Sequence, residues 1–490
     1  MADLAVQFVT HILKLNQEYQ PLDRLYLTNR VYALVGEQLP TDDTPDLLDL
    51  ETALLDAAVA NQKIDDTPTA REILDAELMD LVTSRPSTVN GAFWNHYQVS
   101  PMAATDYFYQ LSQQNDYIKT RVIAKNVVFP VTTNYGDLEI TINLSKPEKD
   151  PKAIAAAQHQ AQTDYPKCQL CMENEGYLGR LGYPARSNHR IIRFTLGGET
   201  WGFQYSPYAY FNEHAIFLNQ EHRPMVINQH TFTNLLEIVR MLPHYFVGSN
   251  ADLPIVGGSM LTHDHYQGGR HVFPMMKAPI IQEFTVAGVQ AGIVKWPLAT
   301  IRLTSDTPEK LVNAATAIQQ TWRDYSDESV DVRAYTGQTR HHTITPIAYR
   351  RDQQYVLDLV LRDNQTSTQY PDGIFHPHPD VQHIKKENIG LIEVMGRAIL
   401  PARLKTEMQA VADYLIGKPV EIAAYHQTWV DDLQQRYDFT AANVEQILDR
   451  EIGLVFARVL EDAGVFKQTT AGQAAFKRFV KCVEKADFYA

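Results

Sequence analysis

Residues 257–269 read GGSMLTHDHYQGG, and they form the densest cluster of chemically active side chains in the 490-residue chain. If this stretch is a β-strand, His263, His265 and Gln267 project to one face, because strand side chains alternate with a period of two. The glycines at its start let backbone N–H groups approach an anion closely. We therefore expect a strand with an anion-binding site on one face.

His265 is the residue that we expect to react with this anion. The unperturbed pKa of imidazole is about 6.5, so the neutral, nucleophilic form is well populated near neutral pH. A phospho-imidazole is also a good leaving group, so one histidine can serve both halves of a transfer. Gln267 can donate to a nonbridging phosphate oxygen without changing its own protonation. An isolated His-x-His is more often a metal or structural pair, but the glycines and Gln267 favour catalysis.

Hydrophobic periodicity on both sides of the stretch predicts an α+β fold. Residues 191–196 and 201–205 predict a β-hairpin around Gly197-Gly198. The other expected elements are helices at 54–60, 70–82, 232–242 and 307–325, strands at 138–144, 215–218 and 298–303, and a second hairpin at 342–349 and 354–362. Thr67-Pro68 is a plausible helix start.

A chain of this length predicts several packed domains. The polar run 146–152 is the expected linker. The predicted divisions are a helical N-terminal extension ending in short strands (1–150), an αβ half with the nucleophile (151–285), a second αβ half (286–400) and C-terminal helices (401–490).

The composition excludes several classes of function. With 44 basic and 58 acidic side chains the net charge is −14, which argues against a nucleic-acid partner. No apolar run approaches the length of a membrane span, and residues 1–17 lack the pattern of a signal peptide. We expect a cytoplasmic protein without a membrane partner, and a homodimer, because closed two-fold assemblies are the commonest.

Two of the three cysteines form Cys168-x-x-Cys171. In a reducing compartment this spacing indicates a metal site or a redox pair before a structural disulfide. Two thiolates are half of a tetrahedral zinc site.

The sequence resembles the histidine-triad superfamily, and specifically its galactose-1-phosphate uridylyltransferase branch, in which glutamine replaces the third histidine. Besides 263–267, the segments 203–207 and 214–222 resemble the strand that enters the nucleotide pocket in that superfamily. The long N-terminal extension and residues 385–390 resemble the second class of these transferases, found in Gram-positive bacteria.

The resemblance implies two histidine-triad-like αβ halves with antiparallel sheets, and a ping-pong exchange of UMP between hexose 1-phosphates. His265 would take the uridylyl group from UDP-glucose, release glucose 1-phosphate, and pass the group to galactose 1-phosphate to give UDP-galactose. No organic cofactor is implied. The implied contacts to phosphate and sugar are Asn250, Gly257, Gly258, Ser259, Lys386, Asn388 and Glu393. Ser259 lies four residues before His263, whereas related transferases have a serine three residues before, so Thr262 is an alternative.

The resemblance also implies a structural zinc ion, held by Cys168, Cys171, His222 and His263. His214 is an alternative to His222, and a reduced cysteine pair without metal is the competing interpretation. The second metal of the first class is less supported here. The prolines around His376-Pro377-His378 indicate a loop, and a position near substrate is the alternative for His341-His342, but we favour a non-catalytic interpretation of both pairs.

Two other functions fit parts of the pattern. A dinucleoside polyphosphate phosphorylase or a nucleotide hydrolase of the same superfamily would share His265, but Gln267 favours the transferase. A non-catalytic, zinc-stabilised nucleotide-sugar binding protein would not need the intact His-x-His-x-Gln.

Overall fold

The computed structural model describes residues 3–41, 46–145, 164–258 and 260–486, which form two compact units. Unit 1 consists of the described residues within 1–121, 147–209 and 215–222, and unit 2 of those within 122–146, 210–214 and 223–490. The linker predicted at 146–152 lies outside the described residues.

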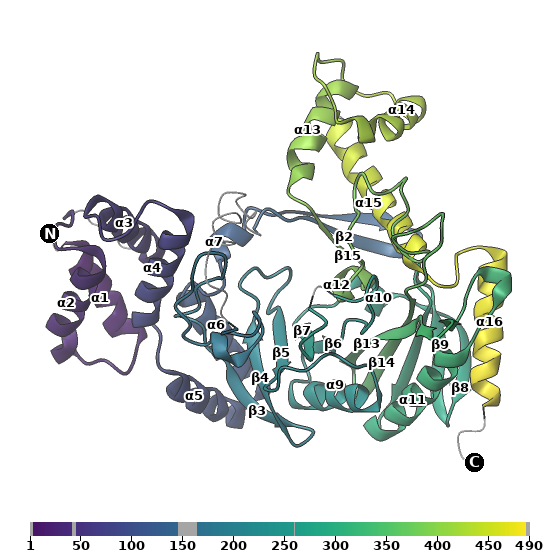
Figure 1. The fold of residues 1–490 in the computed structure, drawn as a ribbon, viewed down its shortest axis with the longest axis horizontal. Helices are drawn as coiled ribbons and strands as arrows, with labels where there is room; N and C mark the ends of the chain where they lie inside the picture. The colour runs from purple at the N-terminus through teal and green to yellow at the C-terminus, as the bar shows by residue number, and fades with distance from the viewer. Residues whose placement is uncertain (1–2, 42–45, 146–163, 259, 487–490) are drawn as a thin grey trace. The chain divides into compact units, whose positions relative to one another are not determined.

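Unit 1 is mainly helical, as its purple and blue ribbon shows (Figure 1). Its helices are α1 (Leu4–Leu15), α2 (Arg24–Val35), α3 (Leu47–Ala60), α4 (Pro68–Leu81), α5 (Pro86–Val99) and α6 (Pro101–Gln114), and α7 (Thr120–Ile123) begins at its end. A side-chain cap explains the start of α4. Thr67 accepts a hydrogen bond from the Ala70 N–H at 3.2 Å, with Pro68 as the first residue of α4, as predicted.

Three antiparallel strands complete unit 1: β3 (Ile192–Leu196), β4 (Glu199–Tyr205) and β5 (Ala215–Asn219). Gly197 and Gly198 form the turn between β3 and β4 with φ of 58° and 82°, a region that favours glycine. The predicted hairpin is confirmed.

Unit 2 is built on a sheet with the strand order β7-β6-β13-β14-β10-β9-β8, in which neighbours are antiparallel. These strands are β6 (Phe246–Gly248), β7 (His265–Gly269), β8 (Ile280–Val286), β9 (Val289–Val294), β10 (Thr300–Ser305), β13 (His342–Arg351) and β14 (Gln354–Asp363). Helices α9 (Gln229–Met241) and α11 (Pro308–Asp324) pack on this sheet (Figure 1). Helix α9 begins before the predicted residue 232, because Asn228 caps it by accepting from the Thr231 N–H.

A second, three-stranded sheet in unit 2 packs against helix α15 (Val444–Ala463) of the C-terminal region. It joins β1 (Val127–Thr133), β2 (Gly136–Ile142) and β15 (Arg397–Leu400), with β15 parallel to β2. The other C-terminal helices are α13 (Arg403–Leu415), α14 (Gln427–Arg436) and α16 (Thr470–Lys485). Helix α13 packs on α14 and α15, whereas α16 packs on α11 and β8. Helix α15 packs closely on β1, where a side chain at Gly453 would lie 2.4 Å from Val131.

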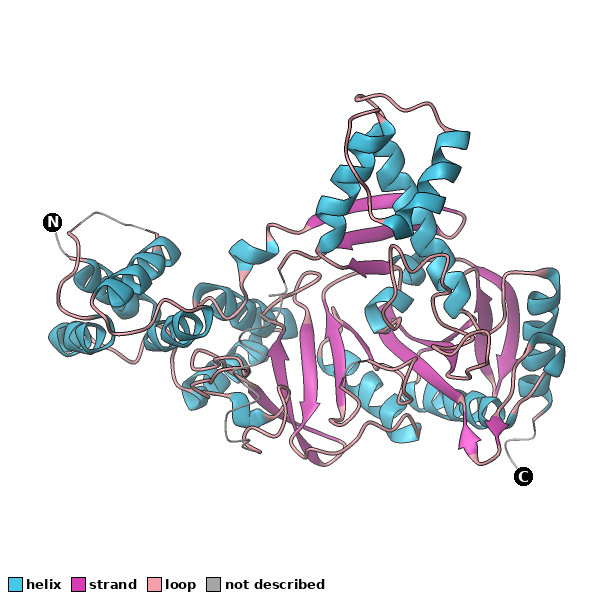
Figure 2. Cartoon of the chain, turned by 45° about the horizontal axis from the view of Figure 1, so that its top comes forward, coloured by secondary structure: helices cyan, strands magenta, loops and turns pink. Residues whose placement is uncertain are grey.

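Other short elements of unit 2 are α10 (Pro274–Lys277), α12 (Leu391–Val394), β11 (Tyr335–Thr336), β12 (Thr339–Arg340) and the 3-10 helices η3 (Glu328–Val330) and η4 (Ala424–His426). Figure 2 shows the mixture of helices and strands, and the predicted α+β class is confirmed. In the described ranges, no helix is both long and apolar enough to cross a membrane.

Candidate active site

Strand β7 positions the two predicted catalytic side chains. It begins at His265, so His263 lies in the bend before it, and the prediction that all three alternating residues share one strand face was wrong for His263. The reason is local: the backbone carbonyl of His263 turns to the His265 ring and accepts a hydrogen bond from Nδ1 at 2.7 Å.

This hydrogen bond selects the tautomer of His265. A carbonyl oxygen only accepts, so Nδ1 carries the proton and the lone pair of the neutral ring lies on Nε2. The side chain is buried, and the bond fixes its ring orientation. The sequence therefore places a nucleophilic nitrogen at a defined end of the imidazole.

Gln267 follows on the same strand, opposite Gly248 of β6. Its Oε1 lies 3.0 Å from Nε2 of His214, which is also buried. Burial lowers the pKa of His214 to about 4, so this histidine is neutral at physiological pH. Sequence reasoning treated His214 only as an alternative metal ligand, because nothing in the sequence pairs it with Gln267.

The glycine turn before β7 is tightly packed. A side chain at Gly257 would lie 2.6 Å from the carbonyl oxygens of Ala251 and Leu253, and one at Gly258 would lie 2.7 Å from Asn250 Nδ2. Only glycine fits at these two positions without displacement of the backbone or of Asn250.

Asn250 itself is buried and accepts from the Leu391 N–H through Oδ1 at 2.9 Å. It therefore ties the glycine turn to the start of α12. Ser259 lies outside the described residues, and its alternative, Thr262, is exposed.

The three predicted substrate residues near α12 have different surroundings. Glu393 accepts from Lys385 Nζ at 3.1 Å and from the Gly390 N–H at 3.2 Å. Asn388 is exposed, with Oδ1 3.2 Å from His376 Nε2. Lys386 is exposed and lines a cavity of about 1030 Å³ between its own segment, 379–386, and helices α14 and α15. The buried lysine here is Lys385, which the sequence did not distinguish from its neighbour.

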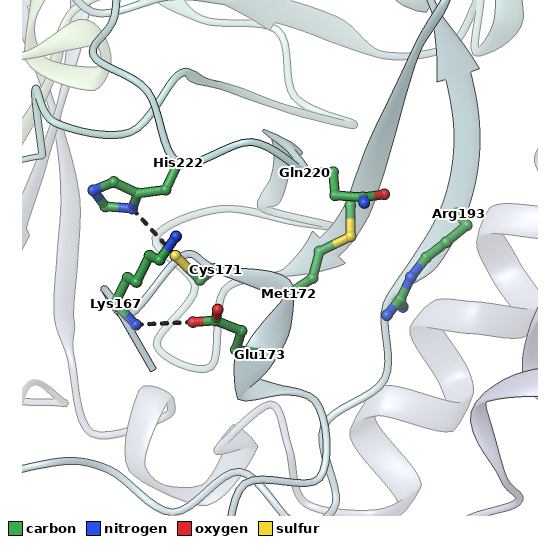
Figure 3. Close-up of a pocket in the computed structure, with 7 residues that line it drawn as sticks. All are labelled: Lys167, Cys171, Met172, Glu173, Arg193, Gln220 and His222. Carbon is green, nitrogen blue, oxygen red and sulfur yellow. Dashed lines mark hydrogen bonds between the residues drawn. The ribbon is translucent and has the colours of Figure 1, made fainter. Parts of the chain in front are cut away.

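Cys168, Cys171 and His222 come together in unit 1. The two sulfurs are 3.5 Å apart, and Cys171 Sγ lies 3.2 Å from His222 Nδ1, the contact drawn in Figure 3. Cys171 and His222 also line a cavity of about 470 Å³. Asn174 holds the cysteine loop by donating to the carbonyls of Cys168 and Cys171, each at 2.8 Å.

The spacing of these three donors fits zinc. Bonds of about 2.3 Å to sulfur and about 2.1 Å to nitrogen place tetrahedral ligands about 3.8 Å (S to S) and about 3.6 Å (S to N) apart. The observed separations are within a few tenths of an ångström of these values.

The other histidine pairs are engaged within the protein. His341 meets Asn364 at 2.9 Å and Thr336 at 2.8 Å through its two ring nitrogens. His342 donates from Nδ1 to the carbonyl of Trp322 at 2.7 Å. His378 contacts the carbonyl of Ile374 at 3.0 Å and stacks on a tyrosine ring. These contacts suit the non-catalytic interpretation.

Comparisons with known proteins decide the family. Two family models, described as galactose-1-phosphate uridyl transferase N-terminal and C-terminal domains, match residues 17–224 and 237–431. The chain belongs to the galactose-1-phosphate uridylyltransferase family. The predicted family, enzyme class (a nucleotidyltransferase) and reaction type, uridylyl transfer in galactose metabolism, are confirmed.

Relatives in this family match over nearly their whole length. The galactose-1-phosphate uridylyltransferase of Lactiplantibacillus plantarum is 67% identical over 477 residues, covering 97% of this chain and 98% of its own. That of Pediococcus pentosaceus is 66% identical over 480 residues (97% and 99%), and that of Streptococcus pneumoniae is 60% identical over 487 (98% and 99%).

Among solved structures, yeast Ap4A phosphorylase in complex with Ap4A is 11% identical with a TM-score of 0.37, covering 68% of this chain and 96% of its own.

Proposed function

We propose that this family member transfers UMP from UDP-glucose to galactose 1-phosphate through a covalent intermediate on Nε2 of His265. In the first step Nε2 attacks the α-phosphorus, and the bond from that phosphorus to the bridging oxygen breaks, releasing glucose 1-phosphate. In the second step a phosphate oxygen of galactose 1-phosphate attacks the same phosphorus. The phosphorus–nitrogen bond breaks, UDP-galactose leaves, and His265 is restored.

One observation carries this proposal: the hydrogen bond from His265 Nδ1 to the His263 carbonyl at 2.7 Å. It keeps the lone pair on Nε2. It also stabilises the positive charge that develops on the ring as the phosphorus–nitrogen bond forms, because the carbonyl oxygen accepts from Nδ1–H. Both effects require only the fixed backbone before β7.

The proposed stabilisation of phosphate comes from neutral donors. Gln267 would donate from its amide to a nonbridging oxygen, and the backbone at Gly257 and Gly258 would approach the phosphates closely. Asn250 would hold this turn in position. Ser259 or Thr262 would be a further phosphate ligand. Neutral donors stabilise the transition-state charge without titrating near pH 7.

Lys386, Asn388 and Glu393 are proposed for the hexose 1-phosphate. Lys386 and Asn388 are exposed and able to meet a ligand. Glu393 would act mainly by holding Lys385 and the Gly390 backbone, to which it is already bonded.

We also propose a structural zinc ion with the ligands Cys168, Cys171, His222 and His263. His263 is fully buried, and the backbone on both sides of it bonds to the segment that starts directly after His222. The Asp264 N–H donates to the Arg223 carbonyl at 2.7 Å, and the Met225 N–H to the Leu261 carbonyl at 3.0 Å. With four protein ligands the ion would fix the backbone before β7 and would supply no reacting group.

The zinc proposal is tested by metal analysis and thermal unfolding of the Cys168→Ser/Cys171→Ser double variant. We expect about one zinc per chain in the parent protein, and loss of both zinc and thermal stability in the variant. The exposed Cys482→Ser variant is the matched control and should keep both. Well under one zinc per chain in a fully active, chelator-free parent would contradict the site.

The remaining expectations concern the whole chain. We propose the domain divisions 1–150, 151–285, 286–400 and 401–490, a cytoplasmic location and a homodimer. Light scattering of the purified protein measures the mass in solution, and a monomer at micromolar concentration would exclude the dimer.

The reaction itself is tested by product analysis with UDP-glucose and a panel of sugar 1-phosphates. We expect glucose 1-phosphate to form in a single-turnover burst without any acceptor, and UDP-galactose to form when galactose 1-phosphate is added. An absence of the burst would rule out a covalent intermediate.

A further inference from the structure

His214 and Gln267 form a pair within unit 2. Nε2 of His214 lies 3.0 Å from Oε1 of Gln267. The centroid of the histidine ring lies 4.5 Å from the centroid of the Phe211 ring. His214 is buried, whereas Gln267 is partly exposed. The histidine therefore contacts the glutamine from inside the protein.

Glu213 anchors this histidine beside β7. Its carboxylate lies 2.9 Å from Arg270 Nε, just after β7, and accepts from the Tyr245 hydroxyl at 2.6 Å. Its carbonyl oxygen lies so close to β7 that a side chain at Gly269 would lie 2.4 Å from it. Gly269 thus permits the approach, and the ion pair with Arg270 and the hydrogen bond from Tyr245 hold Glu213 in place.

The protonation of His214 follows from its surroundings. Burial lowers its pKa to about 4, so the ring is neutral and has one N–H. Its buried Nδ1 has no hydrogen-bond partner among the described residues. A proton on Nδ1 would bury an unpaired N–H, so the stable tautomer carries its proton on Nε2 and donates to Gln267.

We infer that His214 is a positioning residue that fixes the orientation of the Gln267 amide. When Nε2–H of His214 donates to Oε1, the amide oxygen is held inward, and the NH2 group is the part of Gln267 left to donate to a nonbridging phosphate oxygen. A reversed amide would present an oxygen to the phosphate and repel it. This inference rests on the proposed function, because it assumes that Gln267 meets the transferring phosphoryl group.

The test compares His214→Phe, which keeps a flat ring against Phe211, with His214→Gln, whose Nε2 can still donate. We expect His214→Phe to lower kcat for uridylyl transfer by about tenfold with little change in KM for UDP-glucose, as for the loss of one orienting hydrogen bond. His214→Gln should recover most of that loss, which a purely structural effect of the ring would not predict.

A double-mutant cycle with Gln267→Ala separates the outcomes. If His214 acts through Gln267, adding His214→Phe to Gln267→Ala should slow kcat no further. Multiplied losses, or a His214→Phe variant as fast as the parent, would overturn the inference while leaving the proposed function intact. A Gln267→Ala variant as fast as the parent would instead refute the assumption that Gln267 acts on the phosphoryl group.

Discussion

His265 and His342 lie in the same sheet of unit 2, and each donates from Nδ1 to a backbone carbonyl at 2.7 Å. Their other nitrogens differ. Nε2 of His342 lies 3.0 Å from the carboxylate of Asp363, and its ring stacks 3.8 Å from Trp322. Nε2 of His342 thus faces a carboxylate of its own chain, and one face of its ring is covered by Trp322. For His265, the proposed reaction instead requires Nε2 to attack phosphorus.

Charged groups in the same sheet provide a second example of a structural pair. Arg302 of β10 makes two hydrogen bonds to Asp358 of β14, at 2.7 and 2.8 Å, and donates to the carbonyls of Ala278 and Met275. A buried polar group that the chain matches completely is structural. At His265 the hydrogen bond from Nδ1 to the His263 carbonyl sets the ring orientation and the tautomer that the proposed reaction uses.

The largest effect is expected at His265. His265→Gly should lower turnover by roughly 10⁴-fold or more, because it removes the nucleophile and leaves only binding and phosphate stabilisation. The melting temperature should stay near that of the parent, and added imidazole should partly restore release of glucose 1-phosphate. The control is His230→Ala, at an exposed histidine of α9, which should keep full activity. Exchange at near the parental rate by His265→Gly would remove the contrast with His342.

Breaking the matched pair should instead destabilise the fold. Arg302→Met leaves the fully buried Asp358 carboxylate without its cation and should cost about 3–5 kcal/mol in the free energy of unfolding, measured in urea. Adding Asp358→Leu should recover most of that loss, because an apolar pair replaces a buried charge. A single variant as stable as the parent would show that the ion pair is not structural.

Gln267→Ala should lower kcat by about 10²-fold, as for the loss of one donor to a developing negative charge, with little change in stability. Gln290→Ala on β9, an exposed glutamine in the same sheet, is the control and should keep kcat. If kcat is unchanged and KM for UDP-glucose rises, Gln267 binds the ground state and gives no preference to the transition state.

The smallest effect is expected in unit 1, where a buried carboxylate is poorly matched. Burial and the charge of Asp75 raise the pKa of Glu51 to about 8, while Lys119 is already paired with Asp75 and Asp116. The stabilisation from the protonated carboxyl is complete below its unfolded pKa and is lost as pH rises through about 8. We expect the free energy of unfolding of the parent to fall by about 2 kcal/mol between pH 6 and 9, and Glu51→Gln to remove most of that fall. Parallel pH profiles for the two proteins would contradict the assignment.

The sequence predicted the elements well where periodicity and caps determine them. Thr67-Pro68 marked the start of α4, and Gly197-Gly198 marked the turn of the first hairpin. The prediction of one strand through His263 was wrong. The backbone carbonyl of His263 bonds to the His265 ring, and the pattern of hydrophobic and polar residues carries no sign of this bond.

The candidate site was predicted in the same uneven way. The spacing of the motif pointed to His265 and Gln267, but the partnership of Gln267 with His214 joins residues 53 positions apart. The distinction between Lys385 and Lys386 likewise depends on which one is buried against Glu393. Such contacts arise from tertiary packing, which local patterns do not contain.

The central claim, a uridylyl group on Nε2 of His265, is tested most directly by isolating the intermediate. The protein is incubated with UDP-glucose labelled in the uridine, quenched, digested and analysed by mass spectrometry, and the phosphorus–nitrogen linkage is assigned by NMR. The proposed mechanism predicts label on the peptide that contains His265, attached at Nε2 and discharged by galactose 1-phosphate. Label on another residue, or UDP-galactose formation with no label on the protein, would contradict it.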